Sequence, residues 1–167
     1  YLGDEQALRQ GLQLIAEGAD LLDIGGESSR PGAEPVSAEV EIDRVAPVIE
    51  RLRQETDLPL SIDTTKSVVA RAAVAAGANY INDISGLRFD PAIAQVAAET
   101  GAGLFLMHTR GTPREMQSQT DYHDLLAEVT DYLQQGIVLA LEAGVSRRAL
   151  AVDPGIGFAK KLEGNLL

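Results

Sequence analysis

The feature that most constrains this chain is an alternation of two hydrophobic patterns along its whole length. Long segments with apolar residues at helical spacing alternate with short, nearly continuous apolar runs. The spacing predicts helices over residues 4–17, 38–55, 67–76, 91–101 and 122–143, and Pro47 is expected to kink the second helix or delay its start. The apolar runs predict strands over residues 21–24, 60–63, 80–84, 104–108 and 150–153. Buried strands that are joined by helices form a parallel sheet with right-handed crossovers, so we expect an α/β fold.

Two α/β architectures satisfy this alternation, a doubly wound open sheet and part of a (β/α)8 barrel of the TIM type. Each predicted strand ends in a polar residue, and these residues are Asp23, Asp63, Asn82 with Asp83, His108 and Asp153. In a barrel all strand ends converge on one mouth, whereas in an open sheet only those near the switch point meet. No Gly-x-Gly-x-x-Gly turn opens a helix, which weakens the dinucleotide-binding alternative. We therefore favour the barrel.

The chain has 167 residues, which is short for this fold. A complete (β/α)8 barrel needs about 250 residues, and five βα units cannot close a ring of eight. We expect residues 1–167 to form one partial barrel domain whose sheet edges are exposed.

Composition and charge limit the classes of partner. The net charge of −11 makes nucleic acid and membranes poor partners, and an anionic substrate would need a local cation or a metal. The chain has no cysteine, which excludes disulfides and thiolate metal sites and fits a reducing cytosol. No apolar run approaches the roughly 20 residues that span a bilayer.

Four polar segments follow the predicted strands and carry the residues suited to chemistry. They are residues 23–32 (DIGGESSRPG), 61–66 (SIDTTK), 82–86 (NDISG) and 153–158 (DPGIGF). Each alone has an ordinary structural explanation, such as an N-capping Asp, a turn-forming Asn or a surface loop. At successive strand ends of one barrel, their carboxylates and amide could together grip a pterin or guanine-like ring. The donor-rich edge of such a ring would satisfy buried acceptors.

These segments, together with residues 106–113 (LMHTRGTP) and 153–160 (DPGIGFAK), resemble the dihydropteroate synthase family in order and spacing. The first and last segments are specific to that family, while the middle ones are shared with other pterin-binding barrels. The resemblance covers essentially the whole chain. It implies a (β/α)8 transferase that condenses 6-hydroxymethyl-7,8-dihydropterin diphosphate with para-aminobenzoate, giving 7,8-dihydropteroate and pyrophosphate in folate biosynthesis.

The resemblance also implies a role for each matching residue. The pterin-binding positions are Asp63, Asn82, Ile84, Met107 and Asp153. The mobile loop over the para-aminobenzoate and sulfonamide site carries Ser29, Arg30 and Pro31, and the same pocket is lined by Gly157 and Phe158. The catalytic candidates are Asp63 and Arg30, and Asp63 lies near the diphosphate and its Mg²⁺, the implied cofactor.

Family segments that do not match this chain set further expectations. The family's first strand, with an Asn that contacts the metal, would precede Tyr1, so no metal ligand is assigned here. The last two barrel strands would follow Leu167. We expect the 167 residues alone to have negligible synthase activity. For the parent protein the resemblance implies a cytoplasmic homodimer that sulfonamides inhibit.

The remaining titratable residues are expected to be structural. We expect His108 to form a local hydrogen bond rather than act in catalysis, and His123 and Arg114 to lie on the surface. Lys160 could flank a pocket. The acidic residues at positions 39–43 are expected to be stabilised by the dipole of the second helix, because they lie in its first turn.

Two other functions stay open. A corrinoid-linked methyltetrahydrofolate methyltransferase has a similar pterin-binding barrel, but the segment GGESSRP at residues 25–31 favours the synthase. A non-catalytic pterin-binding paralogue would not need the full set of strand-end residues.

Overall fold

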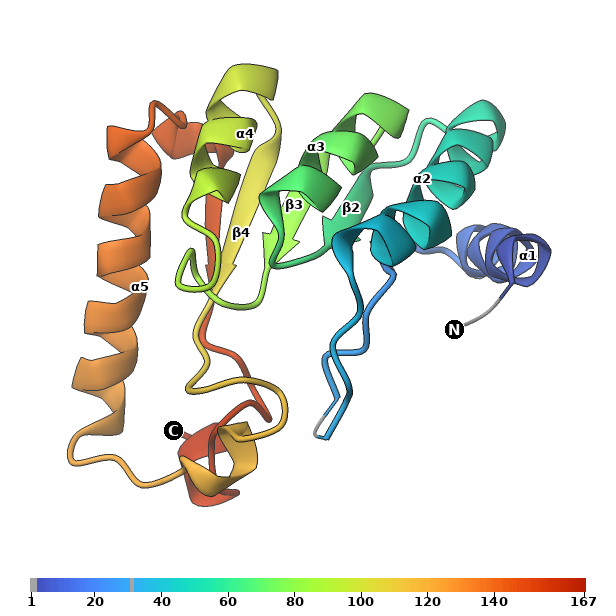
Figure 1. Ribbon diagram of the computed structural model, residues 1–167. Coiled ribbons are helices and arrows are strands. Elements are labelled where there is room, and N and C mark those ends of the chain that lie inside the picture. The colour runs from blue at the N-terminus through green and yellow to red at the C-terminus, as the bar shows by residue number, and fades with distance from the viewer. Residues whose placement is uncertain (1–2, 31) are drawn as a thin grey trace.

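The computed structural model describes residues 3–30 and 32–167 (Figure 1). Helices and strands alternate along the described chain. The helices are α1 (Asp4–Ala16), α2 (Ala38–Glu55), α3 (Ser67–Ala76), α4 (Ala92–Thr100) and α5 (Leu125–Glu142). The strands are β1 (Leu22–Gly25), β2 (Leu60–Asp63), β3 (Tyr80–Asp83), β4 (Gly103–Met107) and β5 (Leu150–Asp153). Short 3-10 turns lie at Met116–Ser118, Arg147–Ala149 and Glu163–Asn165. The predicted alternation is confirmed.

The sheet is parallel, and its strand order is β1-β2-β3-β4-β5. A doubly wound sheet reverses its strand order at a switch point, whereas here each strand pairs with the next one in the sequence. Right-handed crossovers between such strands place the helices on one face of the sheet. Figure 1 shows α2, α3, α4 and α5 following one another in this way. The order therefore agrees with an arc of a (β/α)8 barrel.

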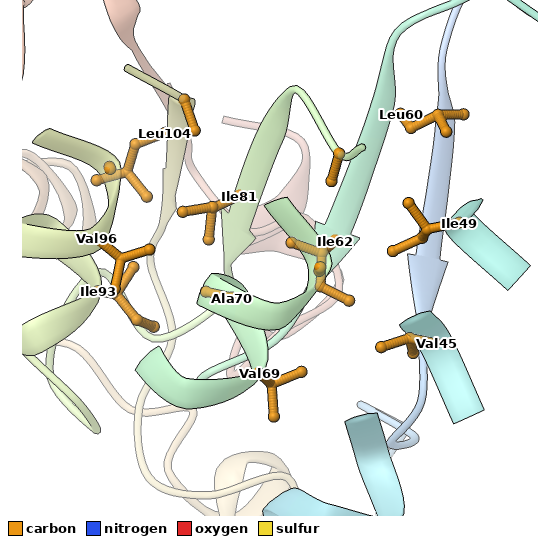
Figure 2. Close-up of a cluster of buried hydrophobic side chains, with 14 of the residues drawn as sticks. Val45, Ile49, Leu60, Ile62, Val69, Ala70, Ile81, Ile93, Val96 and Leu104 are labelled. Atoms are coloured by element: carbon orange, nitrogen blue, oxygen red, sulfur yellow. The ribbon is translucent and has the colours of Figure 1, made fainter. Parts of the chain in front are cut away.

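The hydrophobic core lies between the helices and this face of the sheet (Figure 2). Strand β2 shows how the sequence divides the two faces, because Leu60 and Ile62 are fully buried in the core. Successive side chains of a strand point to opposite faces, so Ser61 and Asp63 point away from the helices. Each buried Leu or Ile side chain contributes about 1.5–3 kcal/mol, so the core face fixes the register of the strand.

Helix α2 corrects one of the two outcomes predicted for Pro47, the late start. The helix does not start late but runs from Ala38 through Pro47 to Glu55, and the Ser37 side chain accepts a hydrogen bond from the Val40 amide at its start. An interior proline costs a helix about 3 kcal/mol or more. Burial of Val45 and Ile49 on either side of the proline offsets that cost.

Two other helix starts differ slightly from the prediction. Helix α4 begins at Ala92, and Asp90 accepts hydrogen bonds from the amides of both Ala92 and Ser67, so one carboxylate caps two helices. Helix α5 begins at Leu125 rather than near Tyr122, because Asp124 is its N-cap. No helix in the described part of the chain is long and apolar enough to cross a membrane.

Candidate active site

The face of the sheet turned away from the helices collects the predicted pterin-binding residues. Asp63 and Asn82 are register partners on β2 and β3, and Met107 and Asp153 are register partners on β4 and β5. Register partners in a parallel sheet point to the same face. Asn82 also pairs with Phe105, which lies two residues before Met107 and therefore shares its face. All four side chains thus lie on one face at the carboxyl ends of their strands, as expected for a site at a barrel mouth.

The amide of Asn82 is oriented by a carboxylate on another strand. Its Nδ2 donates a hydrogen bond of 2.9 Å to Oδ2 of Asp23, across the intervening strand β2. The contact fixes which end of the amide is the donor, so Oδ1 is presented on the other side as an acceptor. Asp23 was predicted only as a strand-end residue. Its position one layer below Asp63 on the same face was the signal that could have placed it in the site.

Asp63 carries the strongest electrostatic perturbation on this face. Burial, together with the nearby carboxylates of Asp23 and Glu41, raises the pKa of Asp63 to about 7. A carboxyl group with such a pKa exchanges its proton near neutral pH, and it is stabilised by hydrogen-bond donors from a bound ring. The half-buried position of Asp63 suits the donor-rich edge of a pterin.

Asn82 and its neighbour Asp83 have opposite roles. Asp83 is fully buried on the helix side and accepts hydrogen bonds from the Ser85 amide at 2.8 Å, the Ser85 hydroxyl at 2.7 Å and the Leu87 amide at 2.7 Å. Asp83 therefore shapes the turn after β3. That turn holds Ile84, the fifth predicted pterin-binding residue, in a buried position.

The described residues of the loop at 26–30 and 32–37, called here the β1–α2 loop, help to line a cavity of about 260 Å³ that Asp63 also lines. Ser28 and Ser29 of the loop line this cavity together with Asp63 and Ile84. The structure thus brings the loop residue Ser29 together with two of the predicted pterin-binding residues. Ser28 was not among the predicted site residues, although it stands beside Ser29 in the same segment.

Arg30 and Asp63 line different cavities. The exposed Arg30 lines a wider cleft of about 1070 Å³ along β1, and Asp23 also lines that cleft. Ser28 and Ser29 line both cavities, so the β1–α2 loop connects the two predicted catalytic residues. Pro31 lies outside the described residues.

The other predicted part of the para-aminobenzoate pocket lies in the turn that follows β5. Gly157 is exposed, its amide donates to Oδ1 of Asn165, and its carbonyl accepts from Nε2 of Gln117. Phe158 is half-buried. Neither residue is among those that line the two cavities described above. That these residues belong to one pocket with Ser29 and Arg30 stays a prediction.

A buried lysine holds the turn after β5. Lys160 is only 7% exposed, and its Nζ lies 3.0 Å from Nδ1 of His108 and donates to the carbonyls of Gly155 at 3.0 Å and Phe158 at 3.1 Å. Burial lowers the pKa of Lys160 to about 8. Burial and the Lys160 charge lower the pKa of His108 to about 4, so the imidazole is neutral and Nδ1 can accept. The predicted local role of His108 is confirmed, and Lys160 is more deeply buried than a pocket-flanking residue.

Of the remaining expectations, two are confirmed and one was incomplete. His123 is exposed, and Arg114 is exposed and pairs with Glu34, so both surface predictions are confirmed. The interpretation of the acidic run at residues 39–43 was incomplete. Glu41 is only 1% exposed and binds Thr64 and Lys66, because its position in the first turn of α2 points it at the end of β2.

The donor set on this face fits a metal only in part. No three His, Asp or Glu side chains among residues 3–30 and 32–167 gather as a metal site. The carboxylates of Asp23 and Asp63 are hard oxygen donors. Such donors suit Mg²⁺ that is held mainly by substrate phosphates and water.

Comparisons with known proteins agree with this geometry. Residues 2–167 match the family model described as pterin binding enzyme. The dihydropteroate synthase of Synechocystis is 49% identical over 160 residues, which are 96% of this chain and 55% of that protein. The Escherichia coli dihydropteroate synthase is 42% identical over 159 residues, 95% of this chain and 56% of that protein.

Solved structures give the same result for the fold. The Xanthomonas albilineans dihydropteroate synthase with 4-aminobenzoic acid superposes with a TM-score of 0.90 at 48% identity, covering 98% of this chain and 57% of that one. The Yersinia pestis dihydropteroate synthase in a sulfonamide drug complex gives a TM-score of 0.92 at 43% identity, covering 97% and 58%. The chain thus spans about half the length of the relatives it matches, and it belongs to the pterin-binding enzyme family.

Proposed function

We propose that the protein containing this chain is a dihydropteroate synthase. The observation that carries the proposal is the shared face of Asp63, Asn82, Met107 and Asp153 at the carboxyl ends of β2 to β5. These residues combine two carboxylates, an amide acceptor and an apolar surface. A pterin ring matches this set with its donor-rich edge and its flat apolar face.

The proposed reaction is the transfer of the pterinylmethyl group to para-aminobenzoate. The bond between the methylene carbon and the diphosphate oxygen breaks, and the diphosphate leaves with the electron pair. The arylamine nitrogen then forms a bond to that carbon and releases one proton. Positive charge develops on the pterin methylene as the diphosphate leaves, and carboxylates held at a fixed distance from that charge lower the barrier.

Individual residues of the chain have proposed tasks in this reaction. Asp63 and Asn82 bind and orient the ring edge, and Met107 packs on the ring. Asp153 is held by its own turn, because its Oδ1 accepts a 2.7 Å hydrogen bond from the Gly155 amide. Arg30 on the β1–α2 loop is the proposed cationic partner for an anionic substrate group.

Mg²⁺ is the proposed cofactor, and it would supply charge that offsets the leaving diphosphate. Asp63, with Asp23 nearby, is the carboxylate that would face it. A cytoplasmic location, a homodimeric parent protein and inhibition by sulfonamides are proposed with the activity. The inactivity of residues 1–167 alone also stays a prediction.

The decisive experiment is an assay of the complete natural protein with the pterin diphosphate, para-aminobenzoate and Mg²⁺. Formation of 7,8-dihydropteroate, lost in Asp63→Asn and Asp153→Asn variants that still fold, is the expected result. Binding of pterin without turnover would favour the non-catalytic paralogue. Methyl transfer from methyltetrahydrofolate would favour the methyltransferase, which the relatives at 42–49% identity do not support.

A further inference from the structure

The β1–α2 loop is tied to the rest of the molecule at its base by a three-residue ion cluster. Nζ of Lys66 donates to Oε2 of Glu27 at 2.7 Å and to Oε2 of Glu41 at 2.5 Å. Glu41 also accepts a 2.7 Å hydrogen bond from the hydroxyl of Thr64. These residues come from the loop, from α2 and from the segment that follows β2. We refer to Glu27, Lys66 and Glu41 as the loop-base cluster.

Glu27 joins the two ends of the loop. Its Oε2 accepts a 2.9 Å hydrogen bond from the amide of Val36, nine residues further along the chain. Arg44 of α2 adds a 2.8 Å hydrogen bond from Nη1 to the carbonyl of Gly26. A single carboxylate therefore closes the loop on itself and ties it to Lys66. Closing a loop in this way limits the conformations open to the residues between its ends.

The loop-base cluster is partly removed from water. Glu41 is almost completely buried, and the side chains of Lys66 and Glu27 are about one quarter exposed. Burial lowers the pKa of Lys66, but hydrogen bonds to the two carboxylates outweigh it, so the net pKa shift of Lys66 is upward. Removing one partner from such a cluster leaves the others poorly compensated.

The contacts at the tip of the loop are weaker by comparison. Gly32 donates a 3.2 Å hydrogen bond to the carbonyl of Pro113, and Glu34 pairs with Arg114 at 3.0 Å. The side chains of this pair are 72% and 59% exposed, and exposed pairs contribute little. The conformation of the loop is therefore set mainly at its base.

The position of the loop-base cluster connects it to the site. Thr64 and Lys66 lie one and three residues after Asp63, and Glu27 directly precedes Ser28 and Ser29, which line the same cavity as Asp63. We propose that Glu27, Lys66 and Glu41 are positioning residues that hold the β1–α2 loop closed over Asp63. The kinetic part of this inference rests on the proposed function, whereas the structural part does not.

The test is a Glu27→Ala variant of the complete natural protein, compared with a Glu99→Ala variant. Glu99 also pairs with an arginine, Arg71, but on an exposed surface away from the loop. In Glu27→Ala the hydrogen exchange of the Val36 amide is expected to accelerate about tenfold or more, as for the loss of one charge-assisted hydrogen bond. In Glu99→Ala it should not change. Unchanged exchange at Val36 in Glu27→Ala would overturn the inference.

Kinetics separate a positioning role from a purely structural one. With a closed loop needed for the second substrate, Glu27→Ala should raise the KM for para-aminobenzoate about tenfold and change kcat less than about twofold. A Lys66→Arg variant, which keeps a cation able to bridge both carboxylates, should restore most of the affinity that Lys66→Met loses. Faster exchange with an unchanged KM would contradict the positioning role. A wild-type protein that makes no dihydropteroate would refute the proposed function, while the exchange comparison would still decide the loop-base cluster.

Discussion

The two loops that flank the site, the β1–α2 loop and the turn after β5, are held in different ways. The first is closed by the carboxylates of Glu27 and Glu41 around Lys66, where Glu27 and Lys66 are about one quarter exposed and Glu41 is buried. The second is closed by Lys160, which is buried and, among the described residues, bonds to backbone carbonyls and a neutral His108 rather than to a carboxylate. One loop thus depends on an ion cluster and the other on a buried lysine bonded to the backbone.

The difference indicates which loop can open. The pair of Glu27 and Lys66 is about one quarter exposed, so these two side chains can exchange each other for water at lower cost than fully buried groups. If the buried ammonium of Lys160 moved away from the carbonyls that it binds, the ammonium and the carbonyls would all lose their hydrogen-bond partners. We therefore expect the β1–α2 loop to open for substrates while the β5 turn stays fixed as a wall.

The largest expected change in the free energy of unfolding comes from adding a methyl group inside the tightly packed turn after β5. Gly155 has φ +70°, and a Cβ there would lie 2.1 Å from the carbonyl oxygen of His108. A Gly155→Ala substitution should lower the free energy of unfolding by about 4 kcal/mol or more, because backbone must move. Gly157 is the matched control, since it has φ +84° but open space, and Gly157→Ala should cost only about 1 kcal/mol. Urea denaturation measures both free energies of unfolding, and equal losses in Gly155→Ala and Gly157→Ala would refute the packing argument.

The same test in the β1–α2 loop should give a smaller effect. A Cβ at Gly26 would lie 2.9 Å from side-chain carbons of Glu41 and Val45 and 3.0 Å from the carbonyl oxygen of Glu41, which is a less severe overlap than the 2.1 Å approach at Gly155. Gly26→Ala should therefore cost about 2–3 kcal/mol and displace Glu41 from Lys66. Gly32→Ala, at an open position with φ +79°, should cost about 1 kcal/mol and leave the ion cluster intact. Urea denaturation and Val36 exchange measure the two effects, and a larger loss for Gly32→Ala would show that packing at Gly26 is loose.

Asp63 beneath the loop should make stability depend on pH. Its pKa is raised from 3.8 to about 7 in the folded protein, so the folded state binds its proton more tightly than the unfolded state does. The free energy of unfolding should therefore fall as pH rises from about 4 through 7. Asp63→Asn should stabilise the protein by about 2 kcal/mol at pH 8 and by little at pH 4. A variant less stable than wild type at pH 8 would contradict this assignment.

The smallest effect is expected at the exposed tip of the loop. Arg114→Ala removes the pair with Glu34, and it should change the free energy of unfolding by less than about 0.5 kcal/mol. The exchange of the Val36 amide should stay at its wild-type rate. A strong acceleration of Val36 exchange in this variant would show that contacts at the tip, and not those at the base, set the conformation of the loop.

The strand ends could be predicted from the sequence because the physics that sets them is local. Short apolar runs placed each strand within about a residue, and period-2 alternation is enough to put Asp63 and Asn82 on one face. The bounds of α2 were also predicted, but the late start considered for Pro47 was wrong, because burial of Val45 and Ile49 outweighs the local preference of the proline.

The contacts of the site could not be predicted because they join distant segments. Glu27 meets Lys66 across 39 positions and Lys160 meets His108 across 52, and both contacts depend on the paths of loops. Glu41 was assigned to the helix dipole because the sequence gives no sign of its burial. Arg30 and Phe158 were grouped by resemblance to complete enzymes, and Phe158 is not among the residues that line the two cavities described above.

The opposite orientations of Asn82 and Asp83 restrict how this segment can change during evolution. A deletion or insertion of one residue within β3 would exchange the two side chains between the faces of the sheet. The ligand would then face an Asp in place of an amide, and the turn after β3 would lose the three hydrogen bonds that Asp83 accepts. Substitutions at neighbouring positions can be tolerated one at a time, but a change in length there damages recognition and folding together.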